Sequence, residues 1–339
     1  MSKLRVAFLG CGGIAGKHAR SLKARDEVEI VSGADVSEEQ VGKFFERALE
    51  GYEPTPAAFT DAAKMYAETS PDAVVICTPH TLHHEQGMQA LDAGLHVLME
   101  KPMVTNAAHA REVKKKADET GKVFVIGYNT PCSPNFKYLR DRIRGGTFGK
   151  LELVSGYLSQ NWKRATAGKW RQDPELSGGG QAYDSGAHLM NSLCWSVESD
   201  VDEVFAFVDN HGTPVDINSV TSVRFANGVM ANITVSGNSP GNGSYMVFVF
   251  DGGRIEIDGW GGRWIKVFGP DGKQIESPGI EGEAMAPADN FVDAILGRDE
   301  PRTSPQNGIV QSDLMDAIYE SARTGGPARP AQQRDRSGR

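Results

Sequence analysis

The stretch Val6-Ala7-Phe8-Leu9-Gly10-Cys11-Gly12-Gly13-Ile14-Ala15 specifies the architecture of the first part of this chain. An apolar run leads into a glycine-rich turn. Beyond the turn, Ile14, His18 and Leu22 lie four residues apart. This spacing places the three side chains on one face of a helix, so the stretch predicts a strand, a tight turn and a helix in succession.

The turn matches the pattern G-x-G-x-x-G/A, which is typical of dinucleotide-binding domains when a strand precedes it and a helix follows. Gly10 allows the tight turn, Gly12 lets a pyrophosphate approach the backbone, and the small Ala15 lets the helix pack against the strand. Gly13 and Ile14 contribute N–H groups at the positive end of the helix dipole. The alternative interpretation is a structural turn that holds no ligand.

Asp35 follows a second predicted strand, Val28–Val31, about twenty residues beyond the glycine turn. A carboxylate at this place accepts hydrogen bonds from the ribose hydroxyls and repels a 2′-phosphate. No arginine lies close to Asp35 in the sequence, and we therefore predict NAD as the cofactor in preference to NADP. The alternative is that Asp35 only caps a helix that begins near Ser37.

Further apolar strands alternate with helical patterns up to residue 128. The strands are expected at 73–77, 96–99 and 123–126, with helices at 84–92 and 107–119. Strands that are apolar throughout indicate a doubly wound parallel sheet covered on both faces, which is a Rossmann domain of the α/β class.

After Gly127 the pattern changes to β-rich runs separated by turn signals. The runs are expected at 151–157, 204–208, 220–225, 229–235, 246–250, 254–257 and 264–268, and the helices at 135–144, around Ala187, at 288–296 and at 309–323. Successive hairpins predict a C-terminal α/β domain with an open, mostly antiparallel sheet. We therefore expect a cofactor domain at 1–128, a substrate-binding and oligomerisation domain at 129–325 and a flexible tail at 326–339.

Composition excludes several classes of protein. The 339 residues contain 36 Lys and Arg and 44 Asp and Glu, and the net charge of −8 disfavours binding to nucleic acid or to anionic membranes. No apolar run is long enough to span a bilayer, and the first residues do not form a signal peptide. Four widely separated cysteines fit a reducing compartment, so we expect a cytoplasmic protein. His80, His83 and His84 lack metal-ligand spacing, and we expect no metal.

A lysine follows the predicted strand 96–99, in the segment Glu100-Lys101-Pro102. The carboxyl ends of parallel strands face the ligand crevice, and Pro102 restricts the conformation of Lys101. Beside a cofactor, such a lysine can hold a hydroxyl or carbonyl oxygen of a substrate. The alternative is an ordinary surface lysine, and the sequence does not determine whether the Lys101–Pro102 bond is cis.

Asp184 and His188 lie four residues apart in a predicted helix, Gln181–Trp195, which follows the run Gly178-Gly179-Gly180. This spacing puts both side chains on one helix face. A carboxylate can orient the imidazole and raise its proton affinity, which suits general acid–base chemistry near neutral pH. The alternative is a surface pair.

Taken together, these motifs resemble those of the Gfo/Idh/MocA family, which includes glucose–fructose oxidoreductase and inositol dehydrogenase. The resemblance rests on the glycine turn, Thr78-Pro79 with His83, Glu100-Lys101-Pro102, the glycine run and the Asp184/His188 pair. It covers nearly the whole chain and implies a Rossmann domain followed by an α/β domain whose open sheet forms the oligomer interface. We therefore expect a homodimer or homotetramer through the C-terminal sheet.

The resemblance also implies roles for single residues. Lys101 contacts the reacting oxygen, His188 takes the hydroxyl proton and Asp184 supports His188. Cofactor contacts are expected from Gly10, Gly12, Gly13, Ile14, Ala15, Asp35, Thr78, Pro79, His80, His83, Glu100, Lys101 and Asn129. Substrate contacts are expected from Trp162, Lys163, Trp170 and Arg171.

The expected reaction is hydride transfer between a ring carbinol of a sugar, cyclitol or related polyol and a nicotinamide, in a cleft between the domains. One alternative is a glycosidase that uses NAD transiently and releases no net NADH. The other is a non-catalytic regulator that binds NAD and a sugar.

Overall fold

The structure, a computed structural model, describes residues 3–331 and divides into two compact units. The first unit contains the residues up to Val104, Ala108–Gly127 and Met285–Pro305. The second contains Thr105–Ala107, Tyr128–Ala284 and the residues from Gln306 onward. The segment Met285–Pro305, which was predicted to lie in the C-terminal domain, therefore belongs to the first unit.

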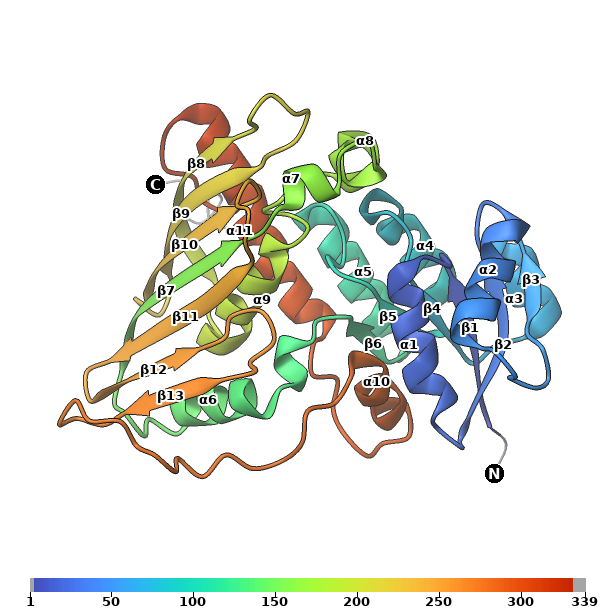
Figure 1. The fold of residues 1–339 in the computed structure, drawn as a ribbon, viewed down its shortest axis with the longest axis horizontal. Helices are drawn as coiled ribbons and strands as arrows, with labels where there is room; N and C mark the ends of the chain where they lie inside the picture. The colour runs from blue at the N-terminus through green and yellow to red at the C-terminus, as the bar shows by residue number, and fades with distance from the viewer. Residues whose placement is uncertain (1–2, 332–339) are drawn as a thin grey trace. The chain divides into compact units, whose positions relative to one another are not determined.

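The first unit is a six-stranded parallel sheet in the order β3-β2-β1-β4-β5-β6 (Figure 1). The strands are β1 (Leu4–Leu9), β2 (Val28–Ala34), β3 (Ala57–Phe59), β4 (Ala73–Ile76), β5 (His96–Met99) and β6 (Phe124–Ile126). The helices are α1 (Gly13–Lys23), α2 (Glu38–Ala48), α3 (Ala62–Thr69), α4 (His83–Asp92), α5 (Ala107–Thr120) and α10 (Pro287–Ile295). The predicted Rossmann sheet is confirmed. Strand β3 was not predicted, because its three residues are too few to show a hydrophobic period.

Helices pack on both faces of this sheet because successive strand residues point to opposite sides. Phe8 and Val75 lie on one face and share a buried cluster with Phe44 of α2 and Phe291 of α10. On the other face α4 approaches β5 so closely that a side-chain carbon at Gly87 would lie 2.9 Å from the Met99 methyl group. Both faces are therefore buried, as nearly continuous apolar strands require.

The second unit contains a seven-stranded sheet in the order β13-β12-β11-β7-β10-β9-β8. The strands are β7 (Leu151–Ser159), β8 (Val201–Asp209), β9 (Asn218–Phe225), β10 (Met230–Ser236), β11 (Gly243–Phe250), β12 (Gly253–Ile257) and β13 (Ile265–Phe268). The helices are α6 (Pro134–Arg144), α7 (Trp162–Ala165), α8 (Pro174–Ser177), α9 (Gly186–Val197) and α11 (Pro305–Thr324). Five of the six strand pairs are antiparallel, and β7 and β10 are parallel. The predicted open, mostly antiparallel sheet is confirmed.

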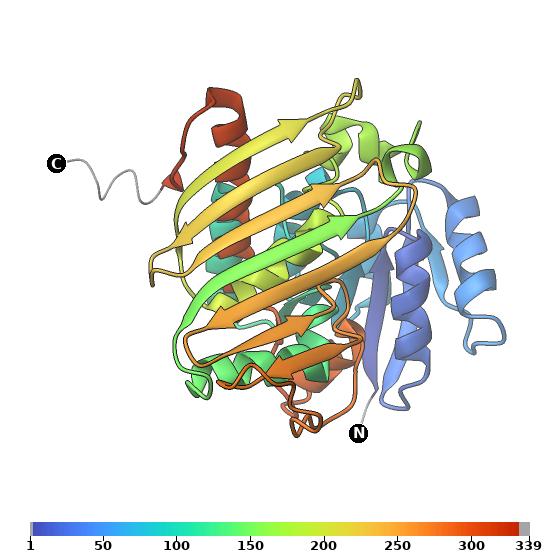
Figure 2. The same cartoon turned by 60° about the vertical axis from the view of Figure 1, so that its left-hand side comes forward.

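One face of the second sheet carries the core of its unit. Burial alternates along β9, where Thr221 and Val223 are buried while Val220 and Arg224 are exposed. The buried face packs against α6, α9 and α11, and Figure 2 shows the opposite face without a covering helix of this unit.

The chain end departs from the predicted tail over the residues that the structure describes. Ala328 pairs with Val204 of β8 through two backbone hydrogen bonds of 2.8 Å. The guanidinium of Arg329 lies 3.4 Å from the Asp202 carboxylate. The segment 326–329 is therefore attached to the sheet edge, while 332–339 lie outside the described residues. Within residues 3–331, the structure contains no helix of the length and hydropathy needed to cross a bilayer.

Candidate active site

The glycine turn has the geometry that a pyrophosphate needs. Gly10 has a φ of +86°, and a Cβ there would lie 2.7 Å from the Cys77 carbonyl carbon, so only glycine fits. Gly12 and Gly13 face open space, since a Cβ added at either position would meet no atom within 4 Å. Gly12 is the N-cap of α1 and offers no side chain to the first N–H groups of the helix. These residues fit the pyrophosphate of a dinucleotide.

The flanking residues complete the turn. Ala15 is fully buried, as close packing of α1 against the sheet requires. Ile14 is 36% exposed, as expected beside a binding surface. The carboxylate of Asp35 accepts hydrogen bonds from the backbone N–H groups of Cys11 (2.7 Å) and Val36 (2.8 Å). Each carboxylate oxygen can accept more than one hydrogen bond, so Asp35 can still receive a ribose hydroxyl.

Two side chains of α2 support the turn, and neither was predicted from the sequence. Gln40 donates to the Cys11 carbonyl (2.8 Å), and Arg47 donates to the Gly12 carbonyl (2.9 Å). No arginine lies close to Asp35 in the sequence, but α2 places Arg47 at the glycine turn. The absence of a neighbouring arginine in the sequence was therefore misleading about the charges at this turn. The positive charge of Arg47 lies where a pyrophosphate would gain from it. A basic residue twelve positions after Asp35 carries no local signal of this contact.

The carboxyl ends of β1, β4 and β5 lie side by side, since β4 pairs with both neighbours. After β4, the Thr78 hydroxyl donates to the Gln86 side chain (2.5 Å), and Pro79 precedes a short 3-10 turn, His80–Leu82. His80 is 3% exposed and its ring lies 5.9 Å from that of His83.

After β5 come Glu100, which is 6% exposed, and Lys101, which is partly exposed and joined to Pro102 by a cis peptide bond. Burial acts to raise the pKa of Glu100, but the hydrogen bond from His18 and the charges of His18 and Lys101 hold this pKa below its ordinary value. Glu100 is therefore an ionised carboxylate at neutral pH.

In the second unit, Asp184 lies outside the helix in which it was predicted. α9 begins at Gly186, and residues 181–185 form turns, so only His188 of the pair is helical. The reason is long-range: the Asp216 carboxylate accepts the N–H groups of Gly180 (2.6 Å) and Ala182 (2.8 Å). These bonds fix the backbone before α9 in a non-helical path. The prediction of one shared helix face was therefore wrong.

Asp184 is 5% exposed and is held by two of the residues predicted to contact substrate. Its Oδ2 accepts hydrogen bonds from the Trp162 indole (2.8 Å) and from Nε of Arg171 (3.1 Å). The Arg171 guanidinium also lies over the Trp170 ring, 4.4 Å from its centroid. Lys163 donates to the His211 carbonyl (2.7 Å).

His188 is 8% exposed and lies among aromatic rings. The Trp260 ring centroid is 4.0 Å away, and the Tyr128 ring meets the imidazole edge-on at 5.7 Å. Asn129 donates from its amide to the Trp260 carbonyl (3.2 Å), while its Oδ1 is buried and has no hydrogen-bond partner among the described residues.

Trp260 also lines a cavity of about 310 Å³. The other lining residues are Leu158, Ser159, Gln160, Asn242, Gly243, Ser244 and Arg263. Hydroxyl and amide groups beside an aromatic ring suit a ligand rich in hydroxyl groups. Over residues 3–331, no cluster of three or more His, Cys, Asp or Glu side chains is arranged to hold a metal ion.

Comparison with known proteins agrees with this geometry. Residues 4–128 match a family model described as an oxidoreductase family with an NAD-binding Rossmann fold, and residues 136–264 match the GFO/IDH/MocA C-terminal domain. The chain belongs to the Gfo/Idh/MocA family. Its first unit is the NAD-binding Rossmann fold of that family.

The relatives of this Gfo/Idh/MocA chain include two named sugar and inositol dehydrogenases. D-glucoside 3-dehydrogenase of Escherichia coli is 29% identical over 57% of this chain and 54% of its own length. Myo-inositol 2-dehydrogenase of Thermotoga maritima is 29% identical over 77% of this chain and 74% of its own length. The match thus spans only about half of the first relative.

The solved WlbA dehydrogenase from Bordetella pertussis, in complex with NADH and UDP-GlcNAcA, shares the fold. Its TM-score is 0.84 at 24% identity, covering 96% of this chain and 98% of that one.

Proposed function

We propose that the protein is an NAD-dependent dehydrogenase that acts on a ring carbinol of a sugar, cyclitol or related polyol. The observation that carries the proposal is the shared edge of β1, β4 and β5, where the glycine turn follows β1 and Lys101 follows β5, with β4 between these two strands. A lysine at the dinucleotide-binding edge of a parallel sheet can bind a substrate oxygen beside the cofactor, whereas a surface lysine elsewhere cannot. NAD, when bound, supplies the hydride acceptor.

The protein side chains handle the oxygen and its proton. The Lys101 ammonium donates to the reacting oxygen and stabilises negative charge that develops there. His188 takes the hydroxyl proton as a general base, a role that typically contributes about 10²–10⁴-fold. Asp184 supports His188, and Trp162 and Arg171 hold Asp184 in place. Trp170, Lys163, Asn129 and His80 remain predicted contacts of substrate or cofactor.

The preference for NAD over NADP is part of the proposal. Asp35 directly follows β2, and its carboxylate would repel a 2′-phosphate. Arg47 bonds to the Gly12 carbonyl instead, at the phosphate turn. Paired titrations with NADH and NADPH, followed by quenching of tryptophan fluorescence, test this choice. Tighter binding of NADPH would contradict it.

Activity is tested with NAD and a panel of myo-inositol, scyllo-inositol, D-glucose, D-xylose and methyl glucoside, with NADH absorbance as the readout. We expect Lys101→Ala and His188→Ala to lower turnover at least about a hundredfold while NADH binding survives. Lys115→Ala and His211→Asn are matched controls on exposed or half-buried positions.

The outcomes separate the classes of function. Near-wild-type turnover in both variants refutes the assigned roles. Cleavage of methyl glucoside without net NADH identifies a glycosidase with transient redox chemistry. Binding of NADH with no turnover on any polyol identifies a non-catalytic regulator.

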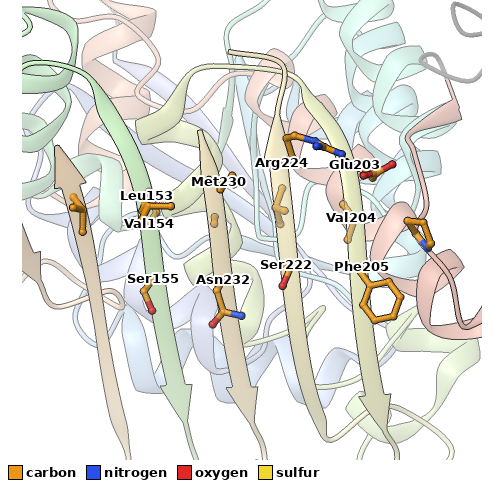
Figure 3. Close-up of a pocket in the computed structure, with 14 residues that line it drawn as sticks. Leu153, Val154, Ser155, Glu203, Val204, Phe205, Ser222, Arg224, Met230 and Asn232 are labelled. Atoms are coloured by element: carbon orange, nitrogen blue, oxygen red, sulfur yellow. Dashed lines mark hydrogen bonds and ion pairs between the residues drawn. The ribbon is translucent and has the colours of Figure 1, made fainter. Parts of the chain in front are cut away.

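We also propose that a second copy of this chain covers the open face of the second sheet. Large apolar side chains are exposed there, and Figure 3 shows two of them, Leu153 and Met230. The exposed side chains are Leu153, Phe207, Val220, Met230 and Tyr245. The face also contains a depression of about 520 Å³. Exposed apolar patches of this kind mark interfaces, and symmetric self-association is the commonest way to cover them.

Light scattering coupled to size-exclusion chromatography tests the interface. Met230→Asp combined with Val220→Asp is expected to give a monomer. Ile275→Asp, at an exposed apolar position outside the seven strands, is the matched control and leaves the assembly intact. A monomeric wild-type protein would refute the proposal.

We propose the cytoplasm as the place of action. Cys11, Cys77, Cys132 and Cys194 are all free thiols in the structure, as a reducing compartment favours. Cell fractionation followed by immunoblotting tests this, and recovery in a secreted fraction would contradict it.

A further inference from the structure

The residues on both sides of Lys101 each lie within hydrogen-bond distance of a buried histidine from another part of the first unit. His18 of α1 lies 2.8 Å from the Glu100 carboxylate. His83, at the start of α4, lies 2.8 Å from the Pro102 carbonyl oxygen. The segment that carries the proposed oxygen-binding lysine is therefore held from two directions.

The contact of His18 with Glu100 is well shielded. The two side chains are 5% and 8% exposed, and the acceptor is an ionised carboxylate, so Nε2 of His18 donates. The second carboxylate oxygen accepts the Lys101 N–H at 3.1 Å. Gly127 makes room for this carboxylate, since a Cβ there would lie 2.9 Å from its Oε1. His18 thus fixes a carboxylate that itself fixes the Lys101 backbone.

His83 connects two strand ends. It is completely buried, with Nδ1 2.8 Å from the Pro102 oxygen and Nε2 3.0 Å from the Thr78 oxygen. Burial lowers the pKa of His83, so the ring is neutral and donates from one nitrogen at a time. Both carbonyl oxygens lie within reach, and the imidazole fills the space between the turns after β4 and β5.

We propose that His18 and His83 are positioning residues that fix the backbone on both sides of Lys101 and so aim its ammonium group. The inference rests on the proposed function of Lys101 and assigns His83 to the protein scaffold instead of direct cofactor contact. His18 lies on α1, the helix whose N-terminus receives the pyrophosphate. The same imidazole therefore ties the phosphate helix to the lysine turn.

A double-mutant cycle tests whether the histidines act through Lys101. We expect His18→Leu and His83→Leu each to lower kcat about tenfold to a hundredfold on the best substrate of the panel, because small misplacements of a reacting group are costly. The Kd for NADH should stay within about threefold. In a Lys101→Ala background, the same changes should alter kcat less than about twofold. Equal losses in both backgrounds would overturn the proposal.

Conservative and control variants keep this test informative. His18→Gln and His83→Gln retain one N–H donor and should recover part of kcat, and they carry the test if the leucine variants do not fold. His96→Gln is the matched control, since His96 accepts the Val123 N–H at the opposite end of β5. We expect this variant to retain the kcat of the wild type.

Hydrogen–deuterium exchange measured by mass spectrometry gives a readout that does not depend on catalysis. His18→Leu and His83→Leu should speed exchange at least about tenfold in a peptide covering residues 99–104, and leave a peptide covering 28–34 unchanged. Unchanged exchange at 99–104 would refute the positioning role. Faster exchange together with full turnover of Lys101→Ala would refute the proposed function and leave the positioning contacts intact.

Discussion

Replacing Asp216 should loosen the second unit, because this one carboxylate holds the backbone before α9. Asp216 is 3% exposed and accepts hydrogen bonds from the N–H groups of Gly180 and Ala182 and from the Tyr319 hydroxyl at 2.6 Å. The backbone of Asp216 also packs tightly against Gly180, since a Cβ at Gly180 would lie 2.0 Å from the Asp216 carbonyl oxygen. We compare Asp216→Asn with Tyr319→Phe, which removes a single hydroxyl.

The two changes differ in what they leave unpaired. Tyr319→Phe loses one hydrogen bond to a charged acceptor, worth about 1.5 kcal/mol. Asp216→Asn keeps the shape, but its amide NH₂ group faces a backbone N–H, which leaves one buried donor unsatisfied. The remaining hydrogen bonds also become weaker, because their acceptor is now neutral. Together with the unsatisfied donor, this gives a loss of about 3 kcal/mol in the free energy of unfolding.

Urea unfolding followed by tryptophan fluorescence measures this loss in the second unit alone, since all five tryptophans lie there. With a slope of about 2 kcal/mol per molar urea, the midpoint should fall by about 0.7 M for Tyr319→Phe and about 1.5 M for Asp216→Asn. A smaller shift for Asp216→Asn than for Tyr319→Phe would refute the reasoning.

Single contacts give three further predictions. Gly12→Ala should fold normally and weaken NADH binding, which a titration with NADH measures. Gly10→Ala should instead lower the melting temperature of the first unit, measured by calorimetry, because only at Gly10 does the added carbon meet backbone atoms. Arg47→Gln should raise the Kd for NADH about threefold to tenfold, because it removes a positive charge at the glycine turn. Lys43→Gln, on the same helix, should leave this Kd unchanged, and equal effects of the two variants would contradict the role of Arg47. Burial acts to raise the pKa of Glu198, but two arginines of α6 hold it below its ordinary value of 4.5, so its stabilising contribution is present above that pH and disappears as the pH falls through the lowered pKa. Glu198→Gln should therefore lower the urea midpoint at pH 7, and the difference from wild type should shrink steadily as the pH is lowered below 4.5.

Local patterns in the sequence were sufficient for the strands and for the glycine turn. Each strand of the second sheet was predicted to within a few residues, because alternating burial and turn residues such as Asn227-Gly228 are properties of neighbouring positions. The glycine turn was equally clear, since its function depends on backbone space within one short segment. The local pattern left two interpretations open for Lys101 and for His188, the family resemblance favoured the catalytic one, and both roles stay predictions.

The remaining features depend on contacts between distant parts of the chain. His18 and Glu100 are separated by 82 positions, and Gly180 and Asp216 by 36. The hydrophobic pattern of the sequence does not predict such a contact, because each partner fits its own local pattern without the other. The order of the strands along the chain and the dinucleotide-binding turn were therefore readable from neighbouring residues. The contacts of His18 and His83 with Glu100 and Pro102 were visible only in the folded chain, and so was the residue at which α9 begins, because both depend on contacts between remote segments.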